Sequence, residues 1–237
     1  MRKSLTRQII LCVVLLLAAC ATMPGGLTNL EHVRTVGLVS AIGSKFSVQK
    51  VGLTAFTNDL KEIPIDSWGI DEYVAGKTRA MLNRRYDVRP TTHNKAPFAP
   101  RRFRASADLV RTDVSPQGLD AYIVIETGSD QYAETNQILH GLGIVEGQRF
   151  GPNYYGIFAL YRVAIIDGHE FKLIGDTYAS LPAERGTWPL HGLHRDVDQS
   201  WWPASLDAAS NPKFNTVVHE LIDRSLPGTL QKLQLTN

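Results

Sequence analysis

One stretch near the middle of the chain, Ala121–Thr127 (AYIVIET), constrains the fold more than any other. Most of its side chains are apolar whichever face of an extended segment they occupy. A strand with one face in water would instead alternate apolar and polar residues. We therefore predict a buried central strand at Ala121–Thr127. Such a strand needs neighbouring strands on both of its edges, and the rest of the chain has to supply them.

The first candidate neighbours lie in the amino-terminal part of the chain. Residues 34–42 (RTVGLVSAI) and 45–56 (KFSVQKVGLTAF) both alternate like strands, and Gly43-Ser44 offers a tight turn between them. We predict that they pair as a hairpin. The alternation of the second segment changes phase, since Phe46 and Val48 share one face and Val51 lies on the other. A side-chain period of two requires a bulge or bend near Gln49-Lys50 to produce this change.

A second hairpin is predicted further along. Residues 154–167 and 169–180 flank Gly168, and the pair Asp167-Gly168 suits a type I′ turn because both of its central positions need positive φ. We also expect shorter strands at residues 86–89 and, inside a glycine-rich segment, at residues 138–145.

Two stretches place apolar residues at helical spacing. We predict a first helix over residues 67–85, capped by Asp66 or Ser67, with acidic residues in its first turn and arginines in its last. A second helix is predicted to start at Pro212, capped by Ser210 or Asn211, and to break at Pro227-Gly228. Together these elements predict an α+β fold, in which a single antiparallel or mixed sheet carries both amphipathic helices on one face.

The amino-terminal end carries an export pattern. Arg2, Lys3 and Arg7 precede an apolar run over residues 9–17. This run is too short to cross a bilayer of ~30 Å as a helix. Leu17-Ala18-Ala19-Cys20 resembles the lipobox of bacterial lipoproteins. The resemblance implies cleavage before Cys20, lipid on its thiol, and acylation of the new amino group, typically with palmitate. An ordinary signal peptide with a chance cysteine is the alternative.

This pattern divides the chain into a signal peptide at 1–19, a tether at 20–29 and a single domain at 30–237. Alanine rather than aspartate at position 21 resembles the class of lipoproteins sorted to the Gram-negative outer membrane. The resemblance implies a lipid anchor in that membrane and a domain that faces the periplasm. The order of elements over residues 33–233 also resembles small α/β envelope lipoproteins, such as penicillin-binding-protein activators and the curli-secretion lipoprotein.

Charge and cysteine content exclude some functions. Removing residues 1–19, with three basic residues and no acidic ones, changes the net charge from +2 to −1. An exported chain that is nearly neutral is not expected to bind nucleic acid. The two cysteines are Cys12 and Cys20, so we expect no disulfide in the folded domain.

Three patterns of residues could support chemistry, and none is complete. Nearby Pro189 and Gly192 disfavour a helix that would place the metal-ligand types of residues 191–198 on one face, so we predict neither a metal nor a cofactor. No G-x-S-x-G turn surrounds a serine near Gly43, and Gly141-Leu142-Gly143 lacks the lysine of a phosphate-binding loop. The possible metal ligands are His191, His194, Asp196, Asp198, His219 and Glu220, and the possible nucleophiles are Ser40 and Ser44.

Two clusters are candidates for binding. Trp188, Trp201 and Trp202 lie in the long connection over residues 182–209, where they could either form a lid on the sheet or bind a partner peptide or sugar ring. The segment Arg101-Arg102-Phe103-Arg104 could contact anionic head groups or lie in a solvated loop.

The sequence thus favours a non-enzymatic envelope lipoprotein. Its domain would bind, or support the assembly of, another envelope protein or cell-wall component. The alternative is an envelope hydrolase, metal- or serine-dependent, that uses the loop over residues 188–202.

Overall fold

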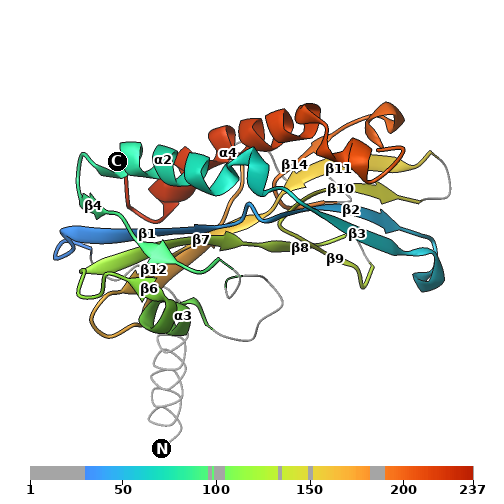
Figure 1. Ribbon diagram of the computed structural model, residues 1–237. Helices are drawn as coiled ribbons and strands as arrows, with labels where there is room; N and C mark the ends of the chain where they lie inside the picture. Colours follow the sequence, from blue (N-terminus) through green and yellow to red (C-terminus); the bar gives the residue numbers. More distant parts are fainter. Residues whose placement is uncertain are drawn as a thin grey trace, which may run out of the picture.

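The computed structural model describes residues 30–95, 98, 105–132, 135–148, 152–181 and 190–236. Within these residues the chain forms two five-stranded mixed sheets, two small two-stranded sheets and three α-helices (Figure 1). The predicted fold, a single sheet with two helices on one face, is therefore wrong. The larger sheets lie end to end in one long layer, with helices on both sides of it.

Sheet A has the strand order β13-β12-β7-β1-β4. Its central strand is β7, which runs parallel to β1 and antiparallel to β12. The buried central strand predicted at Ala121–Thr127 is thus confirmed. The strands of sheet A are β1 (Thr35–Ala41), β4 (Asp87–Arg89), β7 (Ala121–Thr127), β12 (Tyr161–Asp167) and β13 (Leu173–Tyr178).

Sheet B has the order β14-β11-β10-β2-β3, and only its β2–β10 pair is parallel. Its strands are β2 (Lys45–Val51), β3 (Asp59–Pro64), β10 (Leu142–Gly147), β11 (Tyr154–Ala159) and β14 (His194–Asp196). The two small sheets pair β5 (Thr92–His93) with β6 (Val114–Ser115), and β8 (Ser129–Gln131) with β9 (Ile138–His140).

The chain passes between sheets A and B five times: at residues 42–44, between β3 and β4, at residues 128–141, at residue 160, and between β13 and β14. A closed ring of three backbone hydrogen bonds lies at the junction. Gly128 N donates to Leu160 O (2.9 Å), Leu160 N donates to Gly141 O (2.7 Å), and Gly141 N donates to Gly128 O (3.0 Å). Gly141 has a φ of 64°, which favours glycine. A Cβ on Gly128 would lie 3.0 Å from the backbone of Tyr161. We call these three residues the junction ring.

The crossings explain why the first predicted hairpin is wrong and why the second is shorter than predicted. β1 and β2 do not pair with each other, because the chain leaves sheet A at residue 42 and joins sheet B. Residues 154–167 are likewise two strands, divided at Leu160 between the two sheets. β12 and β13 do pair as predicted. Their turn is longer than type I′, because Asp167 Oδ1 accepts hydrogen bonds from the amides of residues 169 and 170, and positive φ falls on Phe171.

The predicted bulge in β2 is also absent. The registers of β2 with β3 and β10 run without a shift from Phe46 to Lys50. The phase changes because both faces of the strand are buried. Phe46 and Val48 pack into the main core, whereas Val51 packs into a second cluster on the opposite face.

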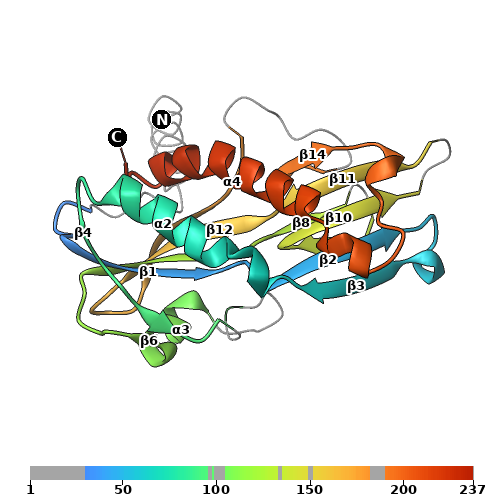
Figure 2. The same cartoon turned by 45° about the horizontal axis from the view of Figure 1, so that its top comes forward.

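Helices α2 (Ile70–Leu82) and α4 (Pro212–Lys232) lie side by side on one face of the sheets, as Figure 2 shows, and α3 (Ser106–Asp113) packs on the opposite face of sheet A. α4 begins as predicted, because Asn211 Oδ1 accepts a hydrogen bond from Lys213 N at 3.0 Å. α2 follows Gly69 without a side-chain cap, so the predicted caps at residues 66 and 67 are wrong. These two residues lie in a 3-10 turn instead.

Pro227 does not end α4, contrary to prediction. Proline in a helix interior removes one hydrogen bond and crowds the preceding turn, at a cost of about 3 kcal/mol. Continuing the helix buries Leu226 and Leu230 in the main core, which offsets this cost. No helix in the described part of the chain is long and apolar enough to cross a membrane.

Candidate functional site

Five predicted site residues lie outside the described residues: Cys20, Arg101, Arg102, Arg104 and Trp188. The remaining ones can be placed. The possible metal ligands do not come together, and among residues with a described position no group of three or more His, Cys, Asp or Glu side chains surrounds a common point.

His194 Nε2 and Asp196 Oδ1 lie 3.5 Å apart, but each candidate also has its own local contacts. The amide of His191 donates to the Asp130 carboxylate at 2.9 Å, and His194 Nδ1 lies 2.7 Å from Gly192 O. Asp198 accepts a hydrogen bond from Ser200 N and so begins the 3-10 turn at Gln199–Trp201. The remaining candidates contact residues of other elements. Asp196 accepts a hydrogen bond from the Tyr154 hydroxyl, Glu220 accepts one from Arg195, and the His219 ring stacks on that of Tyr73.

Ser40 is placed near acidic and basic groups, but not as a nucleophile. Its hydroxyl is buried and donates to Asp71 Oδ1 at 3.0 Å. The same carboxylate accepts the amides of Ile42 and Gly43 and lies 2.9 Å from Lys95 Nζ. His93 Nε2 contacts the Ser40 carbonyl, not its hydroxyl. The group therefore ties the crossing from sheet A to sheet B onto the start of α2. Ser44 is exposed, and its carbonyl accepts the Ile65 amide.

The two described tryptophans differ in their surroundings. Both are half-buried and pack against the main core. The Trp201 ring lies edge-on to Phe214, with centroids 6.1 Å apart, and Lys213 Nζ lies 4.7 Å from the centroid of the indole. The Trp202 ring lies 6.2 Å from that of Tyr155 on β11 and borders an open cleft.

We call this opening the Trp202 cleft. It has a volume of about 230 Å³ and lies between the loop over residues 202–206 and strands β2, β3 and β10. Four charged side chains line its walls, two of each sign: Lys50, Asp59, Lys61 and Glu146.

Strand register brings these charges together. Lys50 on β2 pairs with Asp59 on β3 and with Glu146 on β10. The Lys50 Nζ lies 3.7 Å from Glu146 Oε2, and Lys61 Nζ lies 3.2 Å from Asp59 Oδ2. The cleft thus combines one aromatic wall with donors and acceptors of both charges.

Glu146 is the most buried of the four, at 9% exposure. Its Oε1 accepts hydrogen bonds from Asn153 Nδ2 (2.8 Å) and from the Tyr155 hydroxyl (3.3 Å). Burial raises the pKa of the Tyr155 phenol, and the negative charge of Glu146 adds to this rise. The phenol therefore stays protonated at neutral pH and holds the carboxylate in a fixed position at the cleft.

Trp202 is predictable from its place in an aromatic segment, whereas its charged neighbours were not predicted from the sequence. The signal was present, because Lys50 and Glu146 are charged residues inside strands that are otherwise apolar or buried. Polar groups at such positions need partners, and each is the other's partner across the β2–β10 pair.

Comparison with known proteins adds no relative. No protein-family model matches the chain, and no curated protein matches it either.

Proposed function

We propose that this chain is a lipid-anchored, non-enzymatic binding protein of the bacterial envelope. Cys20 holds it in the outer membrane, and the Trp202 cleft takes up part of another envelope component on the periplasmic side. The lipobox at residues 17–20 supports the anchor. The single observation that carries the binding role is a half-buried tryptophan bordering an open cleft with four charged side chains.

The size of the cleft limits what it binds. Sites that enclose a whole small molecule usually have volumes of about 300–1,000 Å³. The Trp202 cleft, at about 230 Å³, holds a smaller group, such as one side chain or one sugar ring of a larger partner. Aromatic faces beside polar groups suit both of these, since the ring provides apolar contact and the charges provide hydrogen bonds.

The alternative, an envelope hydrolase, has less support. Ser40 is buried with its hydroxyl on a carboxylate, and the His194 ring lies 2.7 Å from the carbonyl of Gly192. A serine hydrolase needs a nucleophile and a base within hydrogen-bond reach of each other at an accessible site, and a metal-dependent one needs several ligands around a common point, which the described residues do not provide.

Photo-crosslinking in the native membrane tests the binding role. A photoreactive residue replaces Ala204, an exposed residue of the cleft wall, in the full chain. We expect a specific crosslinked species that Trp202→Ala abolishes while the thermal unfolding midpoint shifts little. Tyr178→Ala is the control, because it removes a half-exposed aromatic residue from sheet A, and it should leave the crosslink intact. Crosslinks that persist in Trp202→Ala would place recognition elsewhere.

The anchor is tested separately in the same cells. Cys20→Ala should release the protein from the membrane fraction and abolish labelling with a palmitate analogue. A variant that stays membrane-bound, combined with a wild type that takes up no lipid, would refute the anchor and leave the cleft result standing by itself.

A further inference from the structure

A second opening lies at the other end of the helical layer, between the carboxyl ends of α2 and α4. It has a volume of about 610 Å³, within the usual range for small-molecule sites. We call it the Arg84 groove. Its lining residues come from both helices and from the end of the described chain: Ala80, Met81, Arg84, Arg85, Pro227, Leu235 and Thr236.

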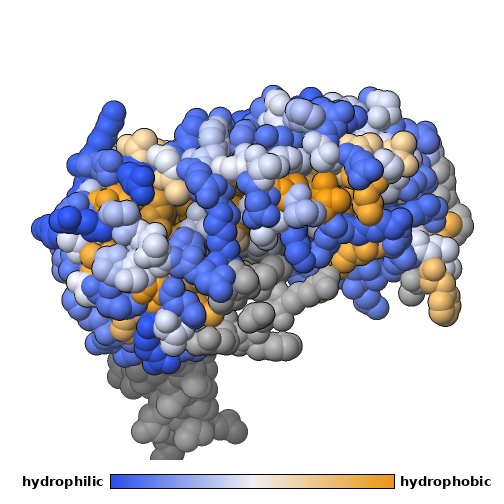
Figure 3. Space-filling model, viewed as in Figure 1, coloured by the Kyte–Doolittle hydropathy of each residue, from blue (hydrophilic) through white to orange (hydrophobic). Residues whose placement is uncertain are grey.

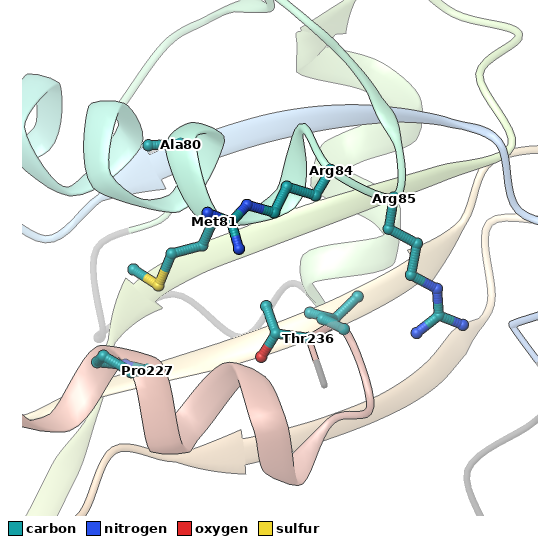
Figure 4. Close-up of a pocket in the computed structure, with 7 residues that line it drawn as sticks. Ala80, Met81, Arg84, Arg85, Pro227 and Thr236 are labelled. Carbon is teal, nitrogen blue, oxygen red and sulfur yellow. The ribbon is translucent and has the colours of Figure 1, made fainter.

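The lining contains two guanidinium groups and no acidic side chain. Arg85 is already engaged, since its Nη1 donates to Gln234 O at 2.6 Å and its guanidinium lies 5.1 Å from the centroid of the Tyr86 ring. Arg84 is exposed and makes no hydrogen bond or ion pair with any residue of described position. In Figure 4 its side chain extends along the groove toward Met81.

The helix dipole explains part of this arrangement. Basic residues near the carboxyl end of a helix are favourable because they offset its partial negative charge. This effect accounts for arginines after α2. The dipole does not explain why an open groove lies beside these arginines, nor why the rest of the groove is lined by apolar residues.

The rest of the lining is largely apolar, with Met81 on α2 beside Arg84, and Pro227 and Leu235 from α4 and the segment after it. Leu235 is buried, Met81 is half-buried, and the exposed ring of Pro227 contributes the edge on α4. Methionine is flexible and polarisable, so it adapts to aliphatic groups of different shape. A simple inorganic anion would pair with Arg84 but leave the apolar lining residues exposed to water. An uncharged aliphatic molecule would cover these residues but leave the guanidinium unpaired.

We propose that the Arg84 groove binds an amphiphilic anion, in which a carboxylate or phosphate head is joined to an aliphatic tail. The head pairs with the Arg84 guanidinium, whose planar donors match both groups. The tail lies against Met81, Pro227 and Leu235. A free fatty acid and a single-chain phospholipid both present this chemistry. The site is separate from the Trp202 cleft and does not depend on the function proposed for it.

The test labels the full chain in its native membrane with a fatty acid that carries a diazirine in its tail. Mapping by mass spectrometry should place the label on peptides that contain residues 80–85 or 227–236. Excess dodecyl phosphate should compete with the label, whereas inorganic phosphate and dodecanol should not. If a phosphate amphiphile and a carboxylate amphiphile both compete, the groove accepts either head group. If only one of them competes, the ligand carries that head group.

Two variants make the test specific. Arg84→Gln should reduce the label about tenfold, the effect of losing one charge-assisted hydrogen bond. Ala80→Trp should reduce it by filling the groove from an exposed position. Arg79→Gln is the matched control, because this exposed arginine lies on the same helix outside the groove. Equal label in all three variants, or label spread over the whole surface, would overturn the proposal.

Discussion

Two parts of one covering layer pack on the sheets in different ways. The helical part, α2 and α4, places apolar side chains at regular intervals, and Leu221 and Ile222 are almost completely buried there. The non-helical part, residues 197–211, covers sheet B with short turns and leaves Trp201 and Trp202 half-buried. Figure 3 shows apolar surface at several points along the molecule, including the protruding end that holds the β2–β3 connection. Phe56 lies in this connection and is 99% exposed.

The difference teaches where stability and recognition reside. A periodic stripe excludes water from the core and leaves few polar groups to satisfy. Irregular turns cannot cover a sheet completely, so strands β2, β3 and β10 keep four charged side chains beside Trp202. We expect substitutions in the helical part to change mainly the free energy of unfolding, and substitutions at the Trp202 cleft to change mainly binding.

Truncating the helical stripe should have the largest effect. Leu221→Ala removes a buried side chain from the centre of α4 and should lower the free energy of unfolding by about 2–5 kcal/mol. Chemical denaturation measures the loss. Gln231→Ala, at an exposed position on the same helix, should change it little. An unchanged midpoint in Leu221→Ala would mean that this stripe is not core, which would break the comparison.

A smaller effect should appear at alkaline pH. The Tyr161 hydroxyl on β12 lies 2.7 Å from Ser225 Oγ on α4, and burial raises its pKa to about 12 from an ordinary 10. The unfolded chain therefore loses this proton at lower pH than the folded one. The protonated Tyr161 hydroxyl therefore contributes about 2–3 kcal/mol to the free energy of unfolding below pH 10. This contribution is lost as pH rises toward 12.

The Tyr161→Phe variant isolates this contribution. Denaturation measured at several pH values should show a shallower decline between pH 10 and 12 than in the wild type. Other buried tyrosines, such as Tyr122, also have raised pKa values and keep part of the slope. Identical slopes in both proteins would show that the contact between β12 and α4 admits water.

The smallest effect should come from a glycine inside α2. Gly76 is exposed, and a Cβ there would meet no atom within 4 Å. Gly76→Ala should therefore stabilise the fold by about 0.5–1 kcal/mol through helix propensity and a less flexible unfolded chain. Thermal unfolding measures the gain. A loss instead would show that position 76 needs room for a neighbour, which would sharpen the limits of the helical part.

Local signals in the sequence predicted local structure well. The apolar run of β7, the stripe of α4 and the cap at Asn211 each depend on neighbours close in sequence. Strand pairing was predicted correctly only for β12 and β13, because two segments joined by a short turn can equally continue into different sheets. Which outcome occurs depends on contacts between distant residues, such as those of the junction ring, whose three residues are up to 32 positions apart in sequence.

The candidate site was predictable in part for a similar reason. Aromatic content alone singled out Trp201 and Trp202, yet only the packed structure separates the one that lies on Phe214 from the one that borders a cleft. The charges of the cleft come from three strands whose register fixes their contact. The Arg84 groove had no sequence signal beyond arginines at a helix end.

The junction ring has a consequence for how the molecule comes apart. The chain crosses between sheets A and B five times, and the ring joins two of these crossings, residues 128–141 and residue 160. Each residue of the ring both donates to and accepts from another member, so breaking any one bond leaves the two crossings joined by at least one other. We therefore expect sheets A and B to open together at this junction rather than one after the other.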